Sequence, residues 1–147
     1  MKKINSTLGI ISVIVLIAGA LMKISHIKYA SIVLDLGALG FLAQFITYLI
    51  LGIKPLTTTL EKSSGIAGGI TMCIIAIGFM FKTMHWPGAN VFVNVSQLGL
   101  VVTSILLIAD SIKETDKVKQ SIKTLFAFTL ILLTIILFFM TQMMYQR

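Results

Sequence analysis

The sequence predicts an all-α integral membrane protein with five transmembrane helices, arranged as two repeated helical hairpins plus a C-terminal helix. Three observations predict this class. Hydrophobic residues make up 57% of the 147 residues and charged residues only 12%, whereas soluble domains are about one quarter charged. The mean hydropathy is +1.02. The apolar residues also gather in runs that approach the roughly 20 residues needed to cross a bilayer.

Five apolar runs give the expected spans, at about 8–22, 30–51, 65–81, 91–109 and 124–143. The first run is short, and it can cross the bilayer if Lys23 snorkels to the interface. Lys2, Lys3 and the small residues 18–20 are also typical of a cleaved signal peptide. We favour a span because the same segment recurs later inside the chain. The last run contains no glycine and is expected to form an outer helix that faces lipid.

A shift of 59 positions aligns the first hairpin, about residues 8–54, with the second, about 66–113, without a gap. The extra helix, about 123–143, completes a single membrane domain. The matching lysines, histidines and glycines carry more weight than matches between apolar residues. They are the pairs Gly19 and Gly78, Lys23 and Lys82, His26 and His85, Gly40 and Gly99, and Lys54 and Lys113. Both copies begin on the same side of the membrane, which makes this a parallel repeat.

The distribution of basic residues predicts the orientation. Eight lysines lie in the N-terminus and the two polar loops, against four basic residues on the other side. The positive-inside rule therefore predicts an inner-membrane protein with a cytoplasmic N-terminus and both Lys–His turns in the periplasm. The same rule, together with contact to anionic lipid, accounts for the net charge of +7 without nucleic acid.

The two Lys–His turns, around residues 23–30 and 82–89, contain the candidate site residues. Histidine can transfer protons in the physiological range, and an ionisable group at membrane depth suggests function. The candidate polar site, for proton or ion movement or for structure, comprises Lys23, His26, Asp35, Lys82 and His85. Asp35 is expected to pair with Lys23, Lys28 or His26. A structural role, with each cation at a helix C-terminus, remains the alternative.

Other residues of the second turn are interpreted as a helix stop and an interface anchor. Pro87 and Gly88 favour a tight turn, and Trp86 is expected at the level of the lipid headgroups. Small residues predict close helix packing, above all Gly65 and Gly69, which are spaced for the approach of another helix. The full set of expected packing glycines is Gly19, Gly37, Gly40, Gly65, Gly69, Gly78 and Gly99.

Several classes of site have no support in the sequence. The single cysteine, Cys73, excludes a disulfide within the chain. Two histidines and one aspartate without a ligand spacing do not predict a metal site. We find no phosphate-binding loop and no pairing of a nucleophile with a base. We therefore expect no enzymatic activity and no cofactor.

The segment 78–89, with Gly78, Lys82, His85 and Gly88, resembles the junction between the two membrane helices of the GldL family. That family forms the stator of the gliding-motility and type IX secretion motor of Bacteroidota. The resemblance covers about residues 69–110 and, more weakly, the first hairpin. Family members are implied to have two spans, a long cytoplasmic tail and a glutamate in the second helix. The corresponding region here holds Leu98, Gly99 and Leu100, so the resemblance implies a GldL-like relative rather than the motor protein itself.

Three functions follow as hypotheses. The first is a structural or assembly subunit of a membrane complex, embedded in the lipid bilayer as a homo-oligomer or with other membrane subunits. The second is proton or ion conduction through the Lys–His turns. The third is small-molecule transport, for which two parallel repeats are the supporting feature. We favour the first.

Overall fold

The computed structural model describes the backbone of residues 2–145 and the side chains of residues 7–136 and 138. Its elements are α1 (Lys2–Ile24), α2 (Ala30–Thr47), the π-helical segment η1 (Tyr48–Gly52), α3 (Thr59–Thr83), α4 (Ala89–Lys113) and α5 (Lys117–Tyr145). Five helices are each long and apolar enough to cross a membrane, with α2 and η1 together forming the second span. The predicted all-α class with five spans is therefore confirmed.

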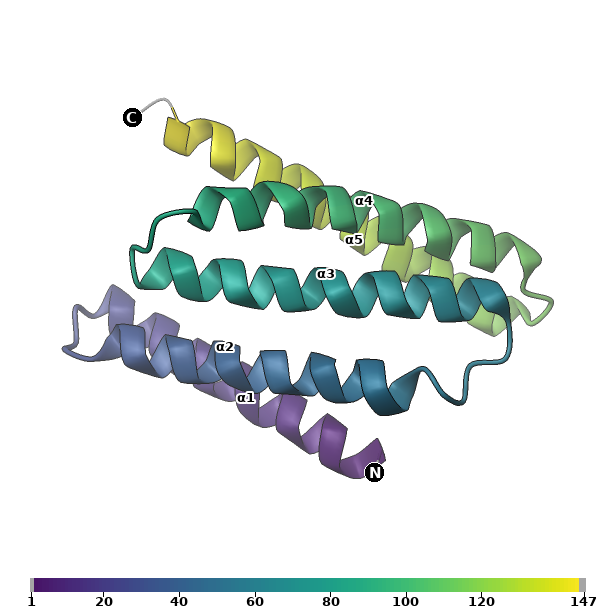
Figure 1. Ribbon diagram of the computed structural model, residues 1–147, viewed down its shortest axis with the longest axis horizontal. Helices are drawn as coiled ribbons and strands as arrows, with labels where there is room; N and C mark the ends of the chain where they lie inside the picture. The colour runs from purple at the N-terminus through teal and green to yellow at the C-terminus, as the bar shows by residue number, and fades with distance from the viewer. Residues whose placement is uncertain (1, 146–147) are drawn as a thin grey trace.

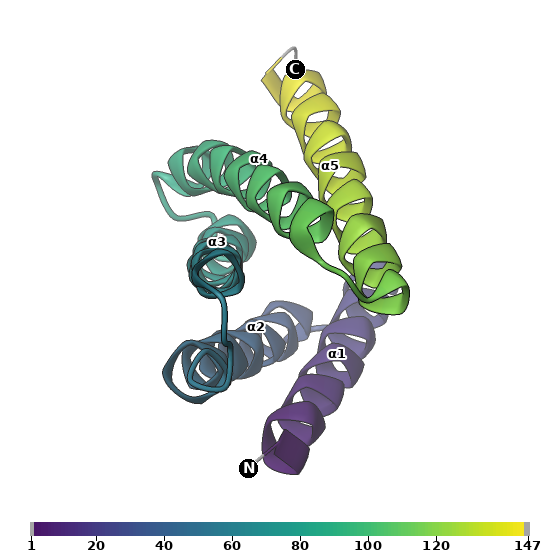
Figure 2. The ribbon, with the colours of Figure 1, turned by 90° about the vertical axis from the view of Figure 1, so that its right-hand side faces the viewer.

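The helices run up and down in chain order, and each packs against its neighbour in the sequence. Figure 1 shows both Lys–His turns at one end of the molecule and both polar loops at the other. Figure 2 shows that the helices follow one another around an arc, with α3 at its middle and α1 and α5 at its ends. Because the helices form an arc, most apolar side chains stay at the surface and few are buried.

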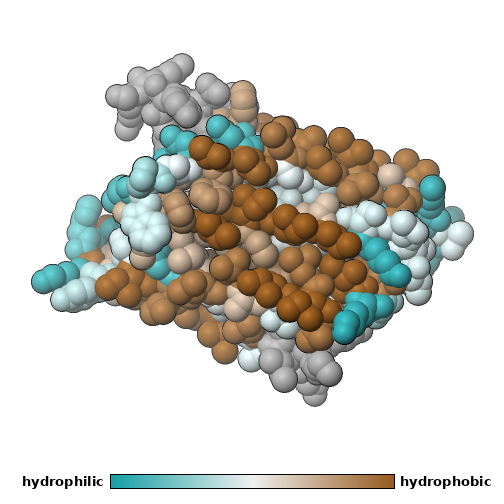
Figure 3. Space-filling model, viewed as in Figure 1, coloured by the Kyte–Doolittle hydropathy of each residue, from teal (hydrophilic) through white to brown (hydrophobic). Residues whose placement is uncertain are grey.

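The surface has the polarity of a multi-pass membrane protein. In Figure 3, hydrophobic residues cover the middle of the visible face, and hydrophilic residues gather at the two ends, near the loops and turns. A surface with an apolar middle and polar ends is what a bilayer requires, since its hydrocarbon core is about 30 Å thick.

Four helices extend further than the sequence patterns predict, and the first of them is α1, which begins at Lys2 rather than near residue 8. α3 begins at Thr59 rather than near residue 65, α4 continues to Lys113, and α5 begins at Lys117. For α3 the reason is local capping. Thr58 accepts a hydrogen bond from the backbone N–H of Glu61, whose carboxylate accepts one from the backbone N–H of Thr58, which is a capping box. Hydropathy marks only the apolar part of a helix, so it missed these charged first and last turns.

Glycines allow close contact within each hairpin, at equivalent positions. A Cβ atom at Gly40 in α2 would collide with the side chain of Ser12 in α1, and one at Gly99 in α4 with that of Thr71 in α3. These pairs are separated by the same 59 positions. Gly19 and Gly37 lie in the α1–α2 contact against Leu34 and Leu16, and Gly78 lies in the α3–α4 contact against Phe92.

The pair Gly65 and Gly69 joins the two hairpins. Both residues lie on α3 and face η1, where Gly65 meets the Tyr48 hydroxyl and Gly69 meets Leu49. The helix that approaches this small-residue face thus belongs to the same chain. Contacts within the chain therefore occupy this small-residue face.

Candidate functional site

The two Lys–His turns have the same backbone conformation at equivalent residues. His26 and His85 have left-handed φ values of 52° and 56°. In each turn the histidine N–H bonds to the lysine carbonyl three residues earlier, at 3.1 Å for His26 and 3.3 Å for His85. The next N–H bonds to the carbonyl five residues before it, at 2.9 Å from Ile27 and 2.8 Å from Trp86. This is the Schellman motif, which ends a helix with a left-handed residue.

The histidines therefore occupy a position that glycine or asparagine usually fills. A side chain at positive φ is unfavourable, and histidine is one of the residues that tolerate it. The residue before the next helix is also left-handed in both turns, with φ of 72° at Tyr29 and 89° at Gly88. Each histidine thus has a role in terminating its helix, which agrees with the structural alternative that places each cation at a helix C-terminus.

The side chains of these turns do not form a common site. Lys23, His26, Lys82 and His85 are all exposed. The Lys82 ammonium lies 3.4 Å from the Asn90 amide oxygen. Trp86 is 53% exposed and stacks edge-on against Phe81, with 5.1 Å between ring centroids. Pro87, like its neighbours, is exposed. Among the described residues, no hydrogen bond, ion pair or ring contact links the first turn to the second.

Asp35 is buried, and its partner differs from the expected one. Only 6% of the residue is exposed, and its carboxylate accepts a hydrogen bond from the hydroxyl of Thr83, which is 8% exposed. No ion pair with Lys23, Lys28 or His26 forms among the described side chains, and the Lys28 ammonium lies over the Tyr29 ring instead. The expected pairing was wrong because Asp35 lies on the face of α2 that meets α3.

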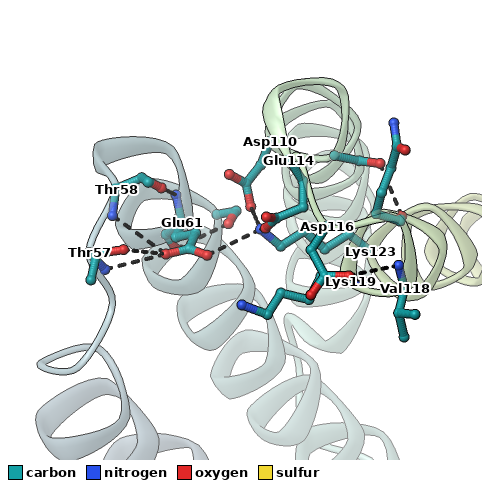
Figure 4. A network of polar contacts seen from close by, with 12 residues as sticks. Thr57, Thr58, Glu61, Asp110, Glu114, Asp116, Val118, Lys119 and Lys123 are labelled. Carbon is teal, nitrogen blue, oxygen red and sulfur yellow. Dashed lines mark hydrogen bonds and ion pairs between the residues drawn. The ribbon is translucent and has the colours of Figure 1, made fainter.

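An ionic cluster at the opposite end of the molecule was not predicted as a site. We use the name ionic cluster for Lys123, Glu61, Asp110 and Glu114, shown in Figure 4. The Lys123 ammonium lies 3.1 Å from Glu61, 2.9 Å from Asp110 and 2.8 Å from Glu114. These three oxygens match its three N–H donors. The cluster therefore ties α3, α4 and α5 together through one side chain.

Local geometry fixes Glu61 in the cluster and Asp116 beside it. Glu61 has two functions, since one carboxylate oxygen receives Lys123 while the other caps α3 at the N–H groups of Thr57 and Thr58. Asp116 caps α5 by accepting from the N–H of Val118 at 3.0 Å. The Thr-x-x-Glu pattern at Thr58 was a readable signal for this helix start. No sequence signal connects Glu61 with Lys123, which is 62 positions away.

Lys123 also changes the acidity of the cluster. Glu114 lies in the short loop between α4 and α5, and the hydrogen bond from Lys123 lowers the pKa of its carboxyl below the ordinary value of 4.5. The carboxylate is therefore stabilised in its charged form, as expected beside an ammonium group.

A cleft extends from the ionic cluster into the bundle. This inner cleft has a volume of about 400 Å³ and lies between α2, η1, α3, α4 and α5. Glu61, Asp110 and Lys123 line one end, and Leu100 and Thr71 line the other. Apolar side chains form most of the wall: Phe45, Leu56, Met72, Leu107, Phe126 and Leu130. The Gln44 amide oxygen beside it is buried without a hydrogen-bond partner among the described residues.

The described residues contain no group of three or more histidine, cysteine or acidic side chains arranged to hold a metal ion. Comparison with protein-family models, with curated proteins and with solved structures gave no match for this chain. The resemblance to GldL therefore depends on the sequence pattern of about residues 69–110 and, more weakly, of the first hairpin.

Proposed function

We propose that the protein is a structural or assembly subunit of a larger membrane complex. The observation that supports this best is Asn94, an exposed amide six residues into α4. Its side chain makes no hydrogen bond with any residue that the structure describes. Within hydrocarbon, an amide without a hydrogen-bond partner raises the free energy by about 2 kcal/mol or more. A hydrogen bond to the helix of another subunit would remove that cost.

The surroundings of Asn94 support a helix as its partner. Asn94 lines a groove between α4 and α5, together with Gln97, Leu98, Val101, Thr134, Ile135 and Phe138. The groove is apolar apart from these amides and one hydroxyl. An apolar wall with a hydrogen-bonding amide is the composition that drives helix association in membranes. The glycine faces do not offer such a surface, because they are filled within the chain.

The test compares two asparagines on the same helix. Asn94→Leu is expected to reduce recovery of the complex, extracted in mild detergent, about five- to tenfold, from a loss of roughly 1 kcal/mol or more. Asn90→Leu, in the first turn of α4, serves as the matched control and should leave recovery unchanged. Equal behaviour of the two variants, or a protein that migrates alone in both, would rule out this interface.

A photo-crosslinking residue gives a second readout. Placed at Leu98, which lines the groove and is 69% exposed, it should react with a protein partner. Placed at Ile32 on α2, which is 55% exposed, it should react with lipid only. Differently tagged copies of the full chain distinguish a homo-oligomer from a complex with another subunit.

The resemblance of residues 78–89 to the GldL hairpin suggests which complex this is. We propose a complex related to the GldL-type motor of gliding motility and type IX secretion. Mass spectrometry of the Leu98 crosslink identifies the partner directly. If the crosslinked partner is a component of that motor, the relationship is supported. If it belongs to an unrelated system, the proposed relationship is wrong.

Proton or ion conduction, the alternative hypothesis, receives less support from the geometry. The region between Asp35, near one end, and the ionic cluster, near the other, includes an apolar part as well as the buried hydroxyls of Thr71 and Thr103. That region contains a second cavity, lined by Leu16, Ala38, Phe41, Phe45, Met72, Ile75, Ala76 and Phe79. A proton path needs polar groups or water along its length, and these side chains offer neither. Proton flux in liposomes that disappears in His26→Ala/His85→Ala would restore this hypothesis.

A further inference from the structure

The inner cleft and the ionic cluster together have the form of a lipid site. The cluster lies where headgroups lie, because Glu61 is in the first turn of α3 and Asp110 in the last turn of α4. The cleft then follows α4 from Asp110 to Leu100, about 15 Å along the helix. That distance is about half of a hydrocarbon core of roughly 30 Å, which is the depth of one leaflet.

The charge of the cluster selects the headgroup. Three carboxylates surround one ammonium, so the cluster carries a net charge of −2 when all are ionised. The three N–H donors of Lys123 are already matched by three carboxylate oxygens, so none is left for a phosphate. Glu61 already accepts from Thr57, Thr58 and Lys123. Asp110 lines the cleft with the ion pair to Lys123 as its described contact, so further acceptor capacity remains there. The site is therefore complementary to a cation with N–H donors.

The size of the cleft selects a lipid rather than a basic helix. A helix of four turns, about 22 Å long and 10 Å across, fills roughly 1,700 Å³. The cleft offers about 400 Å³, which is within the usual range for a small-molecule site. Its walls are mainly aliphatic and aromatic, so water alone is a poor occupant. A single acyl chain matches both the volume and the apolar lining.

We propose that the inner cleft binds a phospholipid with a primary-ammonium headgroup, with an acyl chain along Leu100 and Leu107 and the ammonium at Asp110. This site is separate from the groove at Asn94, so it does not depend on the proposed assembly role. Its occupation would stabilise the contacts among α3, α4 and α5 at the polar-loop end.

The first test uses the wild-type protein and three lipids. Detergent-solubilised protein is offered equal amounts of phosphatidylethanolamine, phosphatidylcholine and phosphatidylglycerol, and bound lipid is measured by native mass spectrometry. We expect phosphatidylethanolamine to be retained about tenfold more than the other two. The quaternary ammonium of phosphatidylcholine has no N–H to donate, and phosphatidylglycerol is anionic. Equal retention of the three lipids, or preference for the anionic one, would overturn the proposal.

Two matched variants locate the site. Asp110→Asn removes a carboxylate that lines the cleft, and retention of phosphatidylethanolamine should fall about tenfold. Asp116→Asn makes the same change at the same end of the molecule without touching Lys123, and asparagine keeps the cap of α5. Retention should then equal that of the wild type. If both variants lose lipid equally, or if neither does, the ammonium does not bind at Asp110. Circular dichroism confirms that each variant is folded.

Discussion

The hydroxyl of Thr83, in the last turn of α3, donates a hydrogen bond to the carboxylate of Asp35, in the second turn of α2. Both residues are buried, and 48 positions separate them in the sequence. The bond joins the two hairpins near the Lys–His turns. At the other end of the molecule, the ionic cluster joins α3, α4 and α5.

Removing the hydroxyl partner of Asp35 should destabilise the protein. Thr83→Val leaves a buried carboxylate without this donor, and the free energy of unfolding is expected to fall by about 1–3 kcal/mol. Chemical denaturation in detergent micelles measures the change. Thr129→Val is the control, because Thr129 is exposed and bonds only to the carbonyl of Leu125 in its own helix. An unchanged unfolding free energy for Thr83→Val would contradict the role of this bond.

Replacing Lys123 of the ionic cluster should lower the free energy of unfolding more than replacing Lys117, another lysine of α5. Lys123→Met leaves Glu61, Asp110 and Glu114 close together without a cation. We expect a loss of about 2 kcal/mol, below the value for a fully buried pair because water reaches this end of the bundle. Lys117→Met, one turn and a half earlier in α5, should leave the unfolding free energy unchanged. Thermal unfolding of the two variants under the same conditions measures the difference in stability.

Acid should weaken the same cluster. The pKa of Glu114 is lower in the folded protein than its ordinary value of 4.5, because Lys123 donates a hydrogen bond to it. Its stabilising contribution is therefore complete above about pH 4.5 and is lost as the pH falls through the folded pKa. In Glu114→Gln, the unfolding temperature should decline less between pH 5 and pH 3 than in the wild type. Parallel declines in the two proteins would show that Glu114 does not contribute to acid sensitivity.

The left-handed conformation of His85 predicts a difference in stability between two variants that both lack the imidazole. His85→Ala should be less stable than His85→Gly by about 1 kcal/mol, since only glycine adopts positive φ without strain. Unfolding temperatures of the two variants measure the difference. The same pair at His26, where φ is also left-handed, should repeat it. If alanine and glycine are equivalent at both positions, the turns relax without the Schellman geometry.

Added bulk at the α3–α4 contact should be costly at one glycine and tolerated at another. A Cβ atom at Gly78 would lie 2.8 Å from the Cβ of Phe92, whereas one at Gly68 would meet only the Thr103 methyl, at 3.3 Å. Gly78→Ala is therefore expected to destabilise the protein by about 1–3 kcal/mol. Gly68→Ala should be close to neutral, because the gain in helix propensity offsets a small contact. Denaturation curves of the two variants provide the comparison.

The sequence alone was sufficient for properties that depend on near neighbours. Five apolar runs predicted five helices long enough to span a membrane, because hydropathy over some 20 residues is a local quantity. The separation of 59 positions placed equivalent residues in two turns that share their backbone conformation. Helix ends were predicted less well, since capping by Thr58 and Asp116 carries α3 and α5 beyond their apolar parts.

Only the tertiary structure decided which side chains meet. The sequence contains Asp35, Thr83, Glu61 and Lys123, but nothing in their spacing pairs the first with the second or the third with the fourth. Those pairings depend on the rotation of each helix about its axis and on the height at which it packs against the next. Both are set by contacts such as those of Gly65 and Gly69 with η1. The inner cleft follows from the same packing, because residues of α2, η1, α3, α4 and α5 line it together.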